Sequence, residues 1–584
     1  MMDEFENIPE ILEEYEDDDL EAQRFKSPTE LDIGQRDGEY YSVDREDFSR
    51  TVKEFSRAFA ELGVRKGDRV ALFSSSRMEW AITDFALLRA GAVVVPIYTG
   101  SSIQYIEKVL GEAEISVAVC EDIEKAKKIE QADQEIEEII VFEPNDDFTT
   151  LKELKTKGTA EMPEIKRKDP ATVVYTSGTT GQPKGVVLTH NNILSNLEQW
   201  SERWNGEEID APLEAGKTAF SVLPMAHIYE RLLGHYYPFA VGATVSYVTQ
   251  PSNFIEDLNV YEPDAGACVP RIFQRVLEGF KKSFCDDKVD EKLFEWAYEV
   301  AVAYSKGDTN QKTERQHEKA DELVYSNFRE FLGGNMDIFW SGGSKLDAEL
   351  AHFFNGAGIP LSEGYGLSET SPVLTSNPMA DIRQETFGKP LKDVEIKIDQ
   401  NNLGAQSENP VGELLVKGPN VFEKYLKKPE ETEKAFTEDG WFRTGDVVER
   451  MDDDYLKFIE RKDNLIILDT GKNVAPSHIE SRLKSISDNI EQVLVVGNER
   501  KFISALVVPK EAGKTQSEIQ KQISSDIEHV NQELQKHESI KDFALVDHKW
   551  TQENGLLTSS GKKRRDKILE NNEKKFKEIY GHED

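Results

Sequence analysis

Cysteine and long apolar runs are scarce in this chain of 584 residues. The three cysteines are scattered without the spacing of metal ligands, so the sequence predicts neither a disulfide framework nor a zinc site. No apolar run approaches the roughly 20 residues of a membrane-spanning helix, and the first residues lack the basic start and apolar core of a signal peptide. We therefore expect a cytoplasmic protein, and leave peripheral contact with a membrane open.

Positive charge is also in short supply. The chain has 71 Lys and Arg residues against 110 Asp and Glu residues, which gives a formal net charge of −39. Nucleic acids and anionic membranes would be repelled, so broad binding to either is not expected. The charge is explained either by a solvated acidic surface that confers solubility or by adaptation to high salt, where self-repulsion is screened. We favour the second explanation.

The length predicts two to four domains, and the pattern of the chain predicts their type. The acidic first twenty residues indicate a solvated or loosely attached tail. From about Asp44, strands and helices alternate, with strands expected at 69–74, 93–98 and 115–120 and helices between them, which indicates a mainly parallel α/β sheet. Segment 281–331 is polar and rich in helix formers, so we expect a helical insertion. After about residue 460 a smaller unit is expected, with strands at 492–497 and 503–509 and one following helix.

The stretch "YTSGTTGQPKGVVLTH", from Tyr175 to His190, combines glycines, hydroxyls and one lysine between two apolar runs. Glycines allow a backbone to approach a ligand closely, while hydroxyls and Lys184 supply donors and positive charge. Pro183 favours an extended conformation before it, and the β-branched residues that follow are typical of a strand. The stretch therefore predicts a phosphate-binding loop between two strands, rather than an ordinary glycine-rich hairpin turn.

Two further glycine-rich segments follow short apolar runs. "SGGSKL" at 341–346 follows "DIFW", and "EGYGLSETSP" at 363–372 follows "GIPL". In an open parallel sheet, ligands bind beyond the carboxyl ends of the strands, so both segments are expected at the same crevice as the first loop. Tyr365 offers a flat face for a base, Ser368 a hydroxyl, and Glu369 a carboxylate that suits Mg²⁺. Asp446 and Arg461 could bind a ribose or could form a surface salt bridge.

Five motifs together carry a family resemblance: "YTSGTTGQPKGV", "LPMAHIYER", "EGYGLSET", "WFRTGD" and "ERKDNLIILDTGKNVAP". In this order, over about residues 40–580, they resemble the core motifs of the adenylate-forming acyl-CoA synthetase superfamily. "LPMAHIYERL", "VPRIFQRV", the insertion at 281–331 and "ENGLLTSS" are most similar to the long-chain fatty acid:CoA ligases.

The resemblance implies an α/β fold and a two-step reaction. A large N-terminal domain of α/β sheet subdomains, residues 41–462, would follow an acidic tail at 1–40, and a small mobile α+β domain, 463–584, would follow a hinge at Asp463. A fatty carboxylate would attack Mg·ATP to give acyl-AMP and pyrophosphate, and CoA would then take the acyl group and release AMP. The resemblance implies that the protein binds ATP and Mg²⁺ and uses coenzyme A as a substrate. The expected oligomeric state is a monomer or a homodimer.

Site residues carry over from the resemblance position by position. The ATP phosphates would be held by Thr176, Ser177, Gly178, Thr179, Thr180, Gly181 and Lys184. The nucleotide and the acyl entrance would be framed by Gly342, Gly343, Ser344, Glu363, Gly364, Tyr365 and Gly366. Ser368 would hold the α-phosphate, Glu369 would hold Mg²⁺, and His227 would lie near the substrate carboxylate. Asp446 and Arg461 would hold the ribose, Gly471 and Lys472 would flank the pantetheine path, and Lys562 would bridge the carboxylate and the α-phosphate.

Two positions depart from the family pattern. Ser559, Ser560 and Gly561 precede Lys562, and Lys563 is a competing candidate for the catalytic lysine. The run "KKRR" could also be only a basic patch. Glu460 stands where the family usually has glycine before the arginine, which bears on the hinge.

Other functions are compatible with parts of the pattern. The enzyme could activate a medium-chain or aryl acid, or could transfer the acyl group to an acceptor other than CoA. A catalytically inactive nucleotide-binding protein would keep Asp446 and the 175–190 loop but lose the catalytic lysine or Glu369, and this chain has both.

Overall fold

The structure is a computed structural model of the whole chain, and it describes residues 5–581 except 17, 19, 28, 30, 32, 156–158, 178–182, 206–210, 401–408, 511–514 and 558–561. The chain divides into two compact units. The first comprises Met1–Glu395 and Lys417–Phe442, and the second comprises Ile396–Val416 and Arg443–Asp584. Within the described ranges, no helix combines the length and the apolar character that crossing a bilayer requires.

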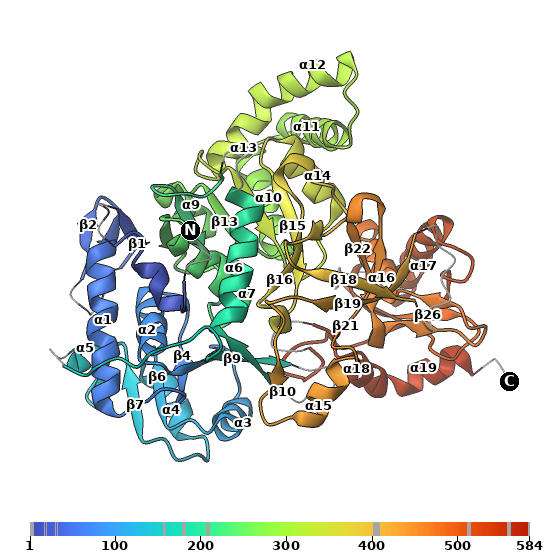
Figure 1. Cartoon of the computed structure of the whole chain (residues 1–584). Coiled ribbons are helices and arrows are strands. Elements are labelled where there is room, and N and C mark those ends of the chain that lie inside the picture. The colour runs from blue at the N-terminus through green and yellow to red at the C-terminus, as the bar shows by residue number, and fades with distance from the viewer. Residues whose placement is uncertain are drawn as a thin grey trace. The chain divides into compact units, whose positions relative to one another are not determined.

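One sheet of the first unit has a parallel centre, as the alternating pattern predicts (Figure 1). Its eight strands run in the order β20 (Lys424–Tyr425), β10 (Pro183–Thr189), β9 (Pro170–Ser177), β5 (Val93–Ile97), β4 (Arg69–Phe73), β6 (Val117–Cys120), β7 (Glu138–Val141) and β8 (Thr149–Thr150). Helix α1 (Arg45–Leu62) precedes β4, and the helices that follow along the chain between these strands include α2 (Met78–Arg89), α3 (Ile103–Ala113), α4 (Ile123–Glu130) and α5 (Leu151–Leu154). Every residue of β5 and β6 is buried, because helices cover both faces of a parallel sheet.

The other sheet of this unit has ten strands. They run in the order β17 (Lys389–Pro390), β16 (Val373–Ser376), β15 (Leu361–Gly366), β14 (Ile338–Ser341), β13 (Ala265–Cys268), β11 (Thr218–Ser221), β12 (Thr244–Tyr247), β1 (Glu21–Phe25), β3 (Tyr40–Asp44) and β2 (Gln35–Asp37). Strands β15, β14, β13, β11 and β12 are parallel. Their helices include α6 (His190–Asn205), α7 (Ile228–Arg231), α8 (Tyr237–Ala240), α9 (Phe254–Tyr261), α10 (Pro270–Phe284) and α14 (Ala348–Gly356).

The N-terminal segment differs from the solvated tail that its acidity predicts. Ile8, Ile11 and Leu12 are buried in the short 3₁₀ helix η2 (Ile8–Leu12), and the backbone N–H of Ile8 donates to Nδ1 of His190 at 3.2 Å. Strand β1 pairs with β12 and β3. The apolar residues between the acids therefore anchor this segment to the first unit, because their burial removes apolar surface from water.

The segment 281–331 is helical, as predicted. It contains α11 (Lys288–Ser305), α12 (Gln311–Ala320), the π-helical turn η4 (Asp321–Tyr325) and α13 (Ser326–Phe331), which lie above α14 in the view of Figure 1. Ala297 and Val300 are buried, whereas Tyr304 remains 37% exposed and stacks on His317 with ring centroids 3.8 Å apart.

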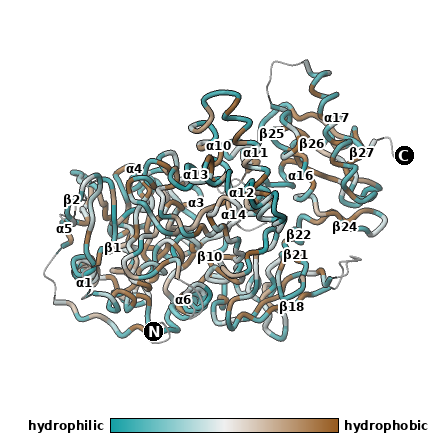
Figure 2. Tube along the Cα trace, turned by 90° about the horizontal axis from the view of Figure 1, so that it is seen from above, coloured by the Kyte–Doolittle hydropathy of each residue, from teal (hydrophilic) through white to brown (hydrophobic). Residues whose placement is uncertain are grey.

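In its described residues, the second unit contains a four-stranded sheet, a three-stranded sheet and a two-stranded hairpin. The first has the order β18 (Glu395–Asp399), β19 (Val411–Lys417), β21 (Phe442–Arg450) and β22 (Leu456–Arg461), and the second has the order β25 (Ile490–Val496), β26 (Ile503–Pro509) and β27 (Ile540–Leu545). A small hairpin joins β23 (Ile466–Ile467) to β24 (Asn473–Val474), and the helices are α16 (Pro476–Ile486), α17 (Gln516–Glu533), α18 (Arg565–Asn571) and α19 (Glu573–Tyr580). In Figures 1 and 2, α16, α17, β25 and β26 lie together around a core rich in Ile and Val. The sheet of β18, β19, β21 and β22 belongs to the same compact unit as this smaller fold. The hinge expected at Asp463 stays a prediction.

Candidate active site

The predicted phosphate loop joins two paired strands. Strands β9 and β10 are antiparallel, with Thr176 opposite Lys184 and Ser177 opposite Pro183. The loop residues Gly178, Thr179, Thr180 and Gly181 lie outside the described residues. The strand–loop–strand prediction is confirmed for the two strands, and the register places the Thr176 and Lys184 backbones side by side at the mouth of the loop.

A single tyrosine connects Lys184 to Glu369. Lys184 Nζ donates to Glu431 Oε2 at 2.6 Å and lies 5.2 Å from the ring centroid of Tyr425. The hydroxyl of Tyr425 donates to Glu369 Oε1 at 2.9 Å, and the carbonyl of Glu369 accepts from the N–H of Phe422 at 2.8 Å. The lysine and the carboxylate therefore come from different sheets but share one neighbourhood. A group made of Mg²⁺ and phosphates needs a carboxylate oxygen for the metal and a cation for the phosphates, and Glu369 and Lys184 are of these two types.

Glu431 is a residue that the motifs do not indicate. It lies in the first turn of α15 (Pro429–Ala435), and hydrogen bonds from Lys184 and Lys434 lower the pKa of its carboxyl. Glu431 is therefore an ionised carboxylate that pairs with the Lys184 ammonium.

The other two glycine-rich segments lie where neighbouring parallel strands end. Ser341 at the end of β14 pairs with Glu363 of β15, and β15 itself extends to Gly366, so residues 363–366 form strand rather than the loop expected from the sequence. A Cβ on Gly342 would lie 2.9 Å from the ring of Tyr229, and a Cβ on Gly366 would lie 1.8 Å from the carbonyl oxygen of Pro372. Glycine is therefore required at both positions by close packing.

The remaining predicted residues of these segments have distinct environments. Gly343 and Ser344 lie in an exposed turn, and Gly364 pairs with Ser376. The ring of Tyr365 contacts the ring of Phe387 in a tilted arrangement, with centroids 4.7 Å apart. Burial raises the pKa of Glu363 to about 8, although Lys345 opposes the shift. Ser368 begins the 3₁₀ turn η5 (Ser368–Thr370), which also carries Glu369.

His227 caps helix α7. Its Nδ1 accepts a hydrogen bond from the N–H of Tyr229 at 3.1 Å, so the neutral ring carries its proton on Nε2. Tyr229 in turn donates from its hydroxyl to the carbonyl of Trp340 at 3.2 Å. The segment with His227 is thereby tied to the strand that precedes Gly342.

The same motif contains residues with a structural role that sequence reasoning did not assign. Arg231 is fully buried and forms an ion pair with Asp84, whose Oδ2 lies 3.2 Å from Nε, and donates to Thr172 Oγ1 at 2.8 Å. The hydroxyl of Tyr236 donates to the same carboxylate at 2.6 Å. Arg231 therefore ties α7 to α2 and to β9, the strand that leads into the phosphate loop.

In the second unit, Asp446 and Arg461 form a pair. They are opposite each other on β21 and β22, with Arg461 Nη1 3.0 Å from Asp446 Oδ1. Asp446 is 2% exposed and Arg461 is 37% exposed. The sequence suggested two roles for these residues, binding of a ribose and formation of a salt bridge. The two roles are compatible, because the partly exposed Arg461 can move away from Asp446 and leave its carboxylate able to accept from a sugar.

Lys562 lies in the field of this pair. Loss of hydration and the positive charge of Arg461 lower its pKa, and the carboxylate of Asp446 opposes the shift. Lys562 as a whole is exposed to solvent.

Lys563 has a different environment from Lys562. Its Nζ donates at 2.6 Å both to Oε2 of Glu480 and to the carbonyl of Val493. Glu480 is buried and also accepts from Arg565 at 2.6 Å, and these cations hold its carboxyl pKa below the ordinary value despite burial. Lys563 thus serves as an internal counter-ion within the second unit.

The departure at Glu460 has a structural explanation. Its carboxylate is buried and accepts from the N–H of Arg461 at 2.9 Å, from Ser477 at 2.8 Å and from Asn464 Nδ2 at 3.4 Å. Ser477 lies in the first turn of α16, where backbone N–H groups lack helical partners. Glu460 therefore caps α16 from strand β22.

Gly471 and Lys472 form the exposed turn of the β23–β24 hairpin. The φ angle of Gly471 is 75°, and its N–H donates to the carbonyl of Leu468 at 2.8 Å. Among the residues that the structure describes, no group of three or more His, Cys, Asp or Glu side chains is arranged to hold a metal. Mg²⁺ commonly uses one or two carboxylates together with substrate phosphates, so the environment of Glu369 fits that mode.

Comparison with known proteins finds family models and relatives that match most of the chain. The family model described as AMP-binding enzyme matches residues 21–426, and the model of the AMP-binding enzyme C-terminal domain matches 463–584. The long-chain-fatty-acid–CoA ligase FadD15 of Mycobacterium bovis is 32% identical over 99% of this chain and 98% of its own, and the long chain acyl-CoA synthetase 3 of Arabidopsis thaliana is 28% identical over 95% and 90%.

Solved structures share the fold. The adenylation domain of a carboxylate reductase from Mycobacterium chelonae has a TM-score of 0.74 at 24% identity, covering 98% of this chain and 90% of that chain. The anthranilate CoA ligase AuaEII, in complex with anthranoyl-AMP, has a TM-score of 0.72 at 19% identity, covering 97% and 96%. The predicted α/β architecture with a large and a small domain is thereby confirmed.

Proposed function

This chain belongs to the AMP-binding enzyme family, and on that premise we propose that it is a long-chain fatty acid:CoA ligase that forms AMP. In the first step a carboxylate oxygen of the fatty acid attacks the α-phosphorus of ATP, and the bond to pyrophosphate breaks. In the second step the sulfur of CoA attacks the acyl carbon, and the bond to the AMP oxygen breaks. The products are acyl-CoA, AMP and pyrophosphate.

The arrangement of Lys184, Tyr425 and Glu369 is the observation that carries the adenylation step. A carboxylate is repelled by the phosphates it has to attack, so the enzyme must neutralise charge and align the reacting atoms. Lys184 supplies a cation at the mouth of the phosphate loop, and Tyr425 orients Glu369. Mg²⁺, held by Glu369 and the phosphates, would add charge neutralisation.

The second unit supplies the remaining proposed contacts. Asp446 would accept the ribose hydroxyls, and Arg461 would donate to the same sugar. Lys562 is the proposed catalytic lysine, which would hold the carboxylate and the α-phosphate together in the first step. The location of Lys563 on the buried Glu480 supports this choice, since a lysine used as an internal counter-ion cannot leave at low cost.

A long acyl chain is supported by the relatives and by one structural feature. The relatives that match nearly the whole chain include a long-chain-fatty-acid–CoA ligase and a long chain acyl-CoA synthetase. The helical insertion α11–α13, which the resemblance associates with the long-chain group, is present. We further propose that the enzyme works in the cytoplasm, in contact with a membrane surface when it takes up substrate, and that its acidity is an adaptation to high salt.

The test is CoA-dependent AMP release from ATP across saturated fatty acids from two to twenty carbons, at low and at molar salt. We expect the best turnover with long chains, a requirement for Mg²⁺, and activity that is retained or increased at molar salt. ATP–pyrophosphate exchange without thioester would mean that the acceptor is not CoA. If no acid supports exchange, the chain is a nucleotide binder and the proposal is wrong.

A further inference from the structure

The segment between β11 and α7, residues 222–227, carries His227 and is here called the 222–227 loop. Glu230 of α7 holds its start: Oε1 accepts from Ser221 Oγ at 2.6 Å and from the N–H of Val222 at 3.1 Å. The N–H of His227 donates to the carbonyl of Pro224 at 2.9 Å, which closes a turn. These contacts fix the two ends of the loop within one sheet.

The middle of the loop is held from the other sheet by one hydroxyl. Ser76, in the connection between β4 and α2, donates from Oγ to the carbonyl of Leu223 at 2.7 Å. The same Oγ accepts from the N–H of Met225 at 2.8 Å. A serine hydroxyl can be donor and acceptor at once, so it satisfies two backbone groups that lie two residues apart.

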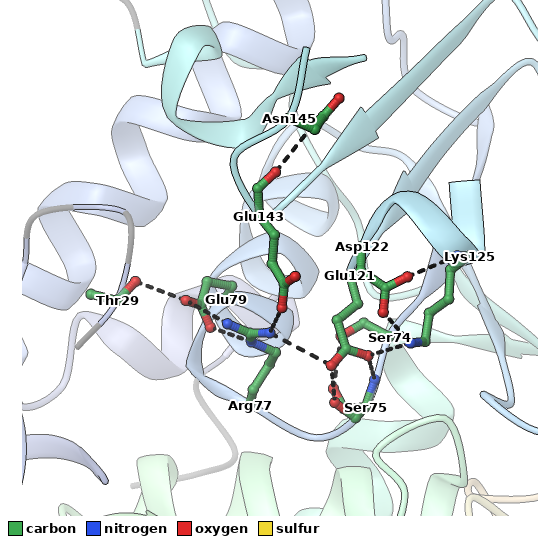
Figure 3. Close-up of polar contacts among 10 residues, drawn as sticks. All are labelled: Thr29, Ser74, Ser75, Arg77, Glu79, Glu121, Asp122, Lys125, Glu143 and Asn145. Carbon is green, nitrogen blue, oxygen red and sulfur yellow. Dashed lines mark hydrogen bonds and ion pairs between the residues drawn. The ribbon is translucent and has the colours of Figure 1, made fainter. Parts of the chain in front are cut away.

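The segment that carries Ser76 is itself held firmly, as Figure 3 shows for its neighbours. Arg77 donates to Glu79 at 2.7 Å and lies 3.6 Å from Glu121 and 3.5 Å from Glu143. Ser75 donates to Glu121 from its N–H at 2.9 Å and from its hydroxyl at 2.7 Å. These contacts join the carboxyl ends of β4, β6 and β7 into one network. Because Ser76 lies between Ser75 and Arg77, which belong to that network, its hydrogen bonds connect the 222–227 loop to a fixed segment.

We propose that Ser76 is a positioning residue for acyl adenylation, which holds the 222–227 loop so that His227 keeps its place at the reacting groups. The inference rests on the proposed function. Ser76 acts through the backbone of Leu223 and Met225 and not by touching substrate. Small displacements of a positioned group reduce rates strongly, so loss of this hydroxyl should lower the rate of the first step more than it weakens the binding of ATP.

The experiment compares Ser76→Ala with Ser74→Ala as a matched control. Ser74 lies two residues away, and its hydroxyl donates to the carbonyl of Ser75 and not to the loop. We expect Ser76→Ala to lower kcat of ATP–pyrophosphate exchange about tenfold with little change in KM for ATP. Ser74→Ala should keep the wild-type kcat, and Ser76→Thr, which retains a hydroxyl, should keep most of it.

A double-mutant cycle tests the route of action. If Ser76 acts through the loop, adding Ser76→Ala to His227→Ala should cause almost no further loss of exchange activity. Fully additive losses would overturn the proposal, as would a fall in thermal stability that accounts for the whole effect of Ser76→Ala.

Backbone hydrogen exchange separates this inference from the proposed function. The amide of Met225 should exchange faster in Ser76→Ala than in wild type or Ser74→Ala. If the wild type catalyses no exchange with any fatty acid, the proposed function fails, while this measurement still decides whether Ser76 holds the loop. Unchanged protection at Met225 would overturn the proposal whatever the enzyme's substrate.

Discussion

Tyr425 donates its hydroxyl to Glu369 Oε1 at 2.9 Å and lies with its ring 5.2 Å from Lys184 Nζ. One aromatic side chain thus orients a carboxylate and borders a cation that come from two different sheets. Strand β20, which contains Tyr425, pairs with β10, which contains Lys184, so the backbone of the tyrosine is fixed beside that of the lysine strand.

The first prediction concerns Tyr425→Phe, which removes the hydrogen bond to Glu369 and leaves the ring in place. Partners of metal-binding carboxylates typically change metal affinity by 10–100-fold, so we expect about a tenfold higher Mg²⁺ concentration for half-maximal ATP–pyrophosphate exchange. Titration of Mg²⁺ at saturating ATP and fatty acid measures this. An unchanged Mg²⁺ dependence would show that Tyr425 does not orient the metal ligand.

The second prediction separates the two adjacent lysines. Lys562→Ala should reduce adenylation by at least about 10²-fold, a typical effect of losing a positioned charged group, and leave the free energy of unfolding near the wild-type value. Lys563→Ala should instead lower the free energy of unfolding by about 2 kcal/mol, because the buried Glu480 loses one of its two cations. Exchange kinetics and urea unfolding on both variants decide the assignment. The reverse pattern would make Lys563 the catalytic lysine.

The third prediction concerns the pH dependence of stability. Burial raises the pKa of Glu230 from 4.5 to about 8, so the folded protein keeps a proton that the unfolded chain releases between these values. The contribution of Glu230 to the free energy of unfolding is therefore full below pH 4.5 and is lost as the pH rises toward 8. Glu230→Gln cannot ionise, so its stability should fall less over this range in urea unfolding from pH 5 to 8. Parallel curves for the two proteins would contradict the prediction.

The fourth prediction concerns Glu460. Replacement by glycine, the residue that the family pattern has at this position, removes a buried carboxylate that accepts from Arg461, Ser477 and Asn464. We expect the free energy of unfolding to fall by about 1–3 kcal/mol, because the first turn of α16 loses its acceptor. Glu460→Gln, which keeps an acceptor oxygen, serves as the control and should recover part of the loss. Unfolding curves identical to wild type would show that β22 does not stabilise α16.

Much of the architecture follows from local pattern. The runs at 69–74, 93–98 and 115–120 are mostly apolar and alternate with helical segments, which is sufficient to identify buried parallel strands. The two strands that flank the predicted phosphate loop are also confirmed, because Pro183 and the "GVVLT" run favour extended backbone whatever surrounds them. The N-terminal segment was misjudged because its acidity outweighed three apolar residues, Ile8, Ile11 and Leu12, whose burial depends on surfaces far along the chain.

The sequence by itself determined the buried strands of the parallel sheet and the order of the glycine-rich segments, since each depends on residues close together in the chain. Only the tertiary structure decided which residues far apart in the chain are in contact at the site. Tyr425 reaches Glu369 over 56 positions and Ser76 reaches Leu223 over 147, and no local pattern marks either contact. The same reason separates Lys562 from Lys563: they are equivalent in the sequence, but only Lys563 faces the buried carboxylate of Glu480. Such pairings depend on how sheets and helices stack, which is a property of the whole packed core.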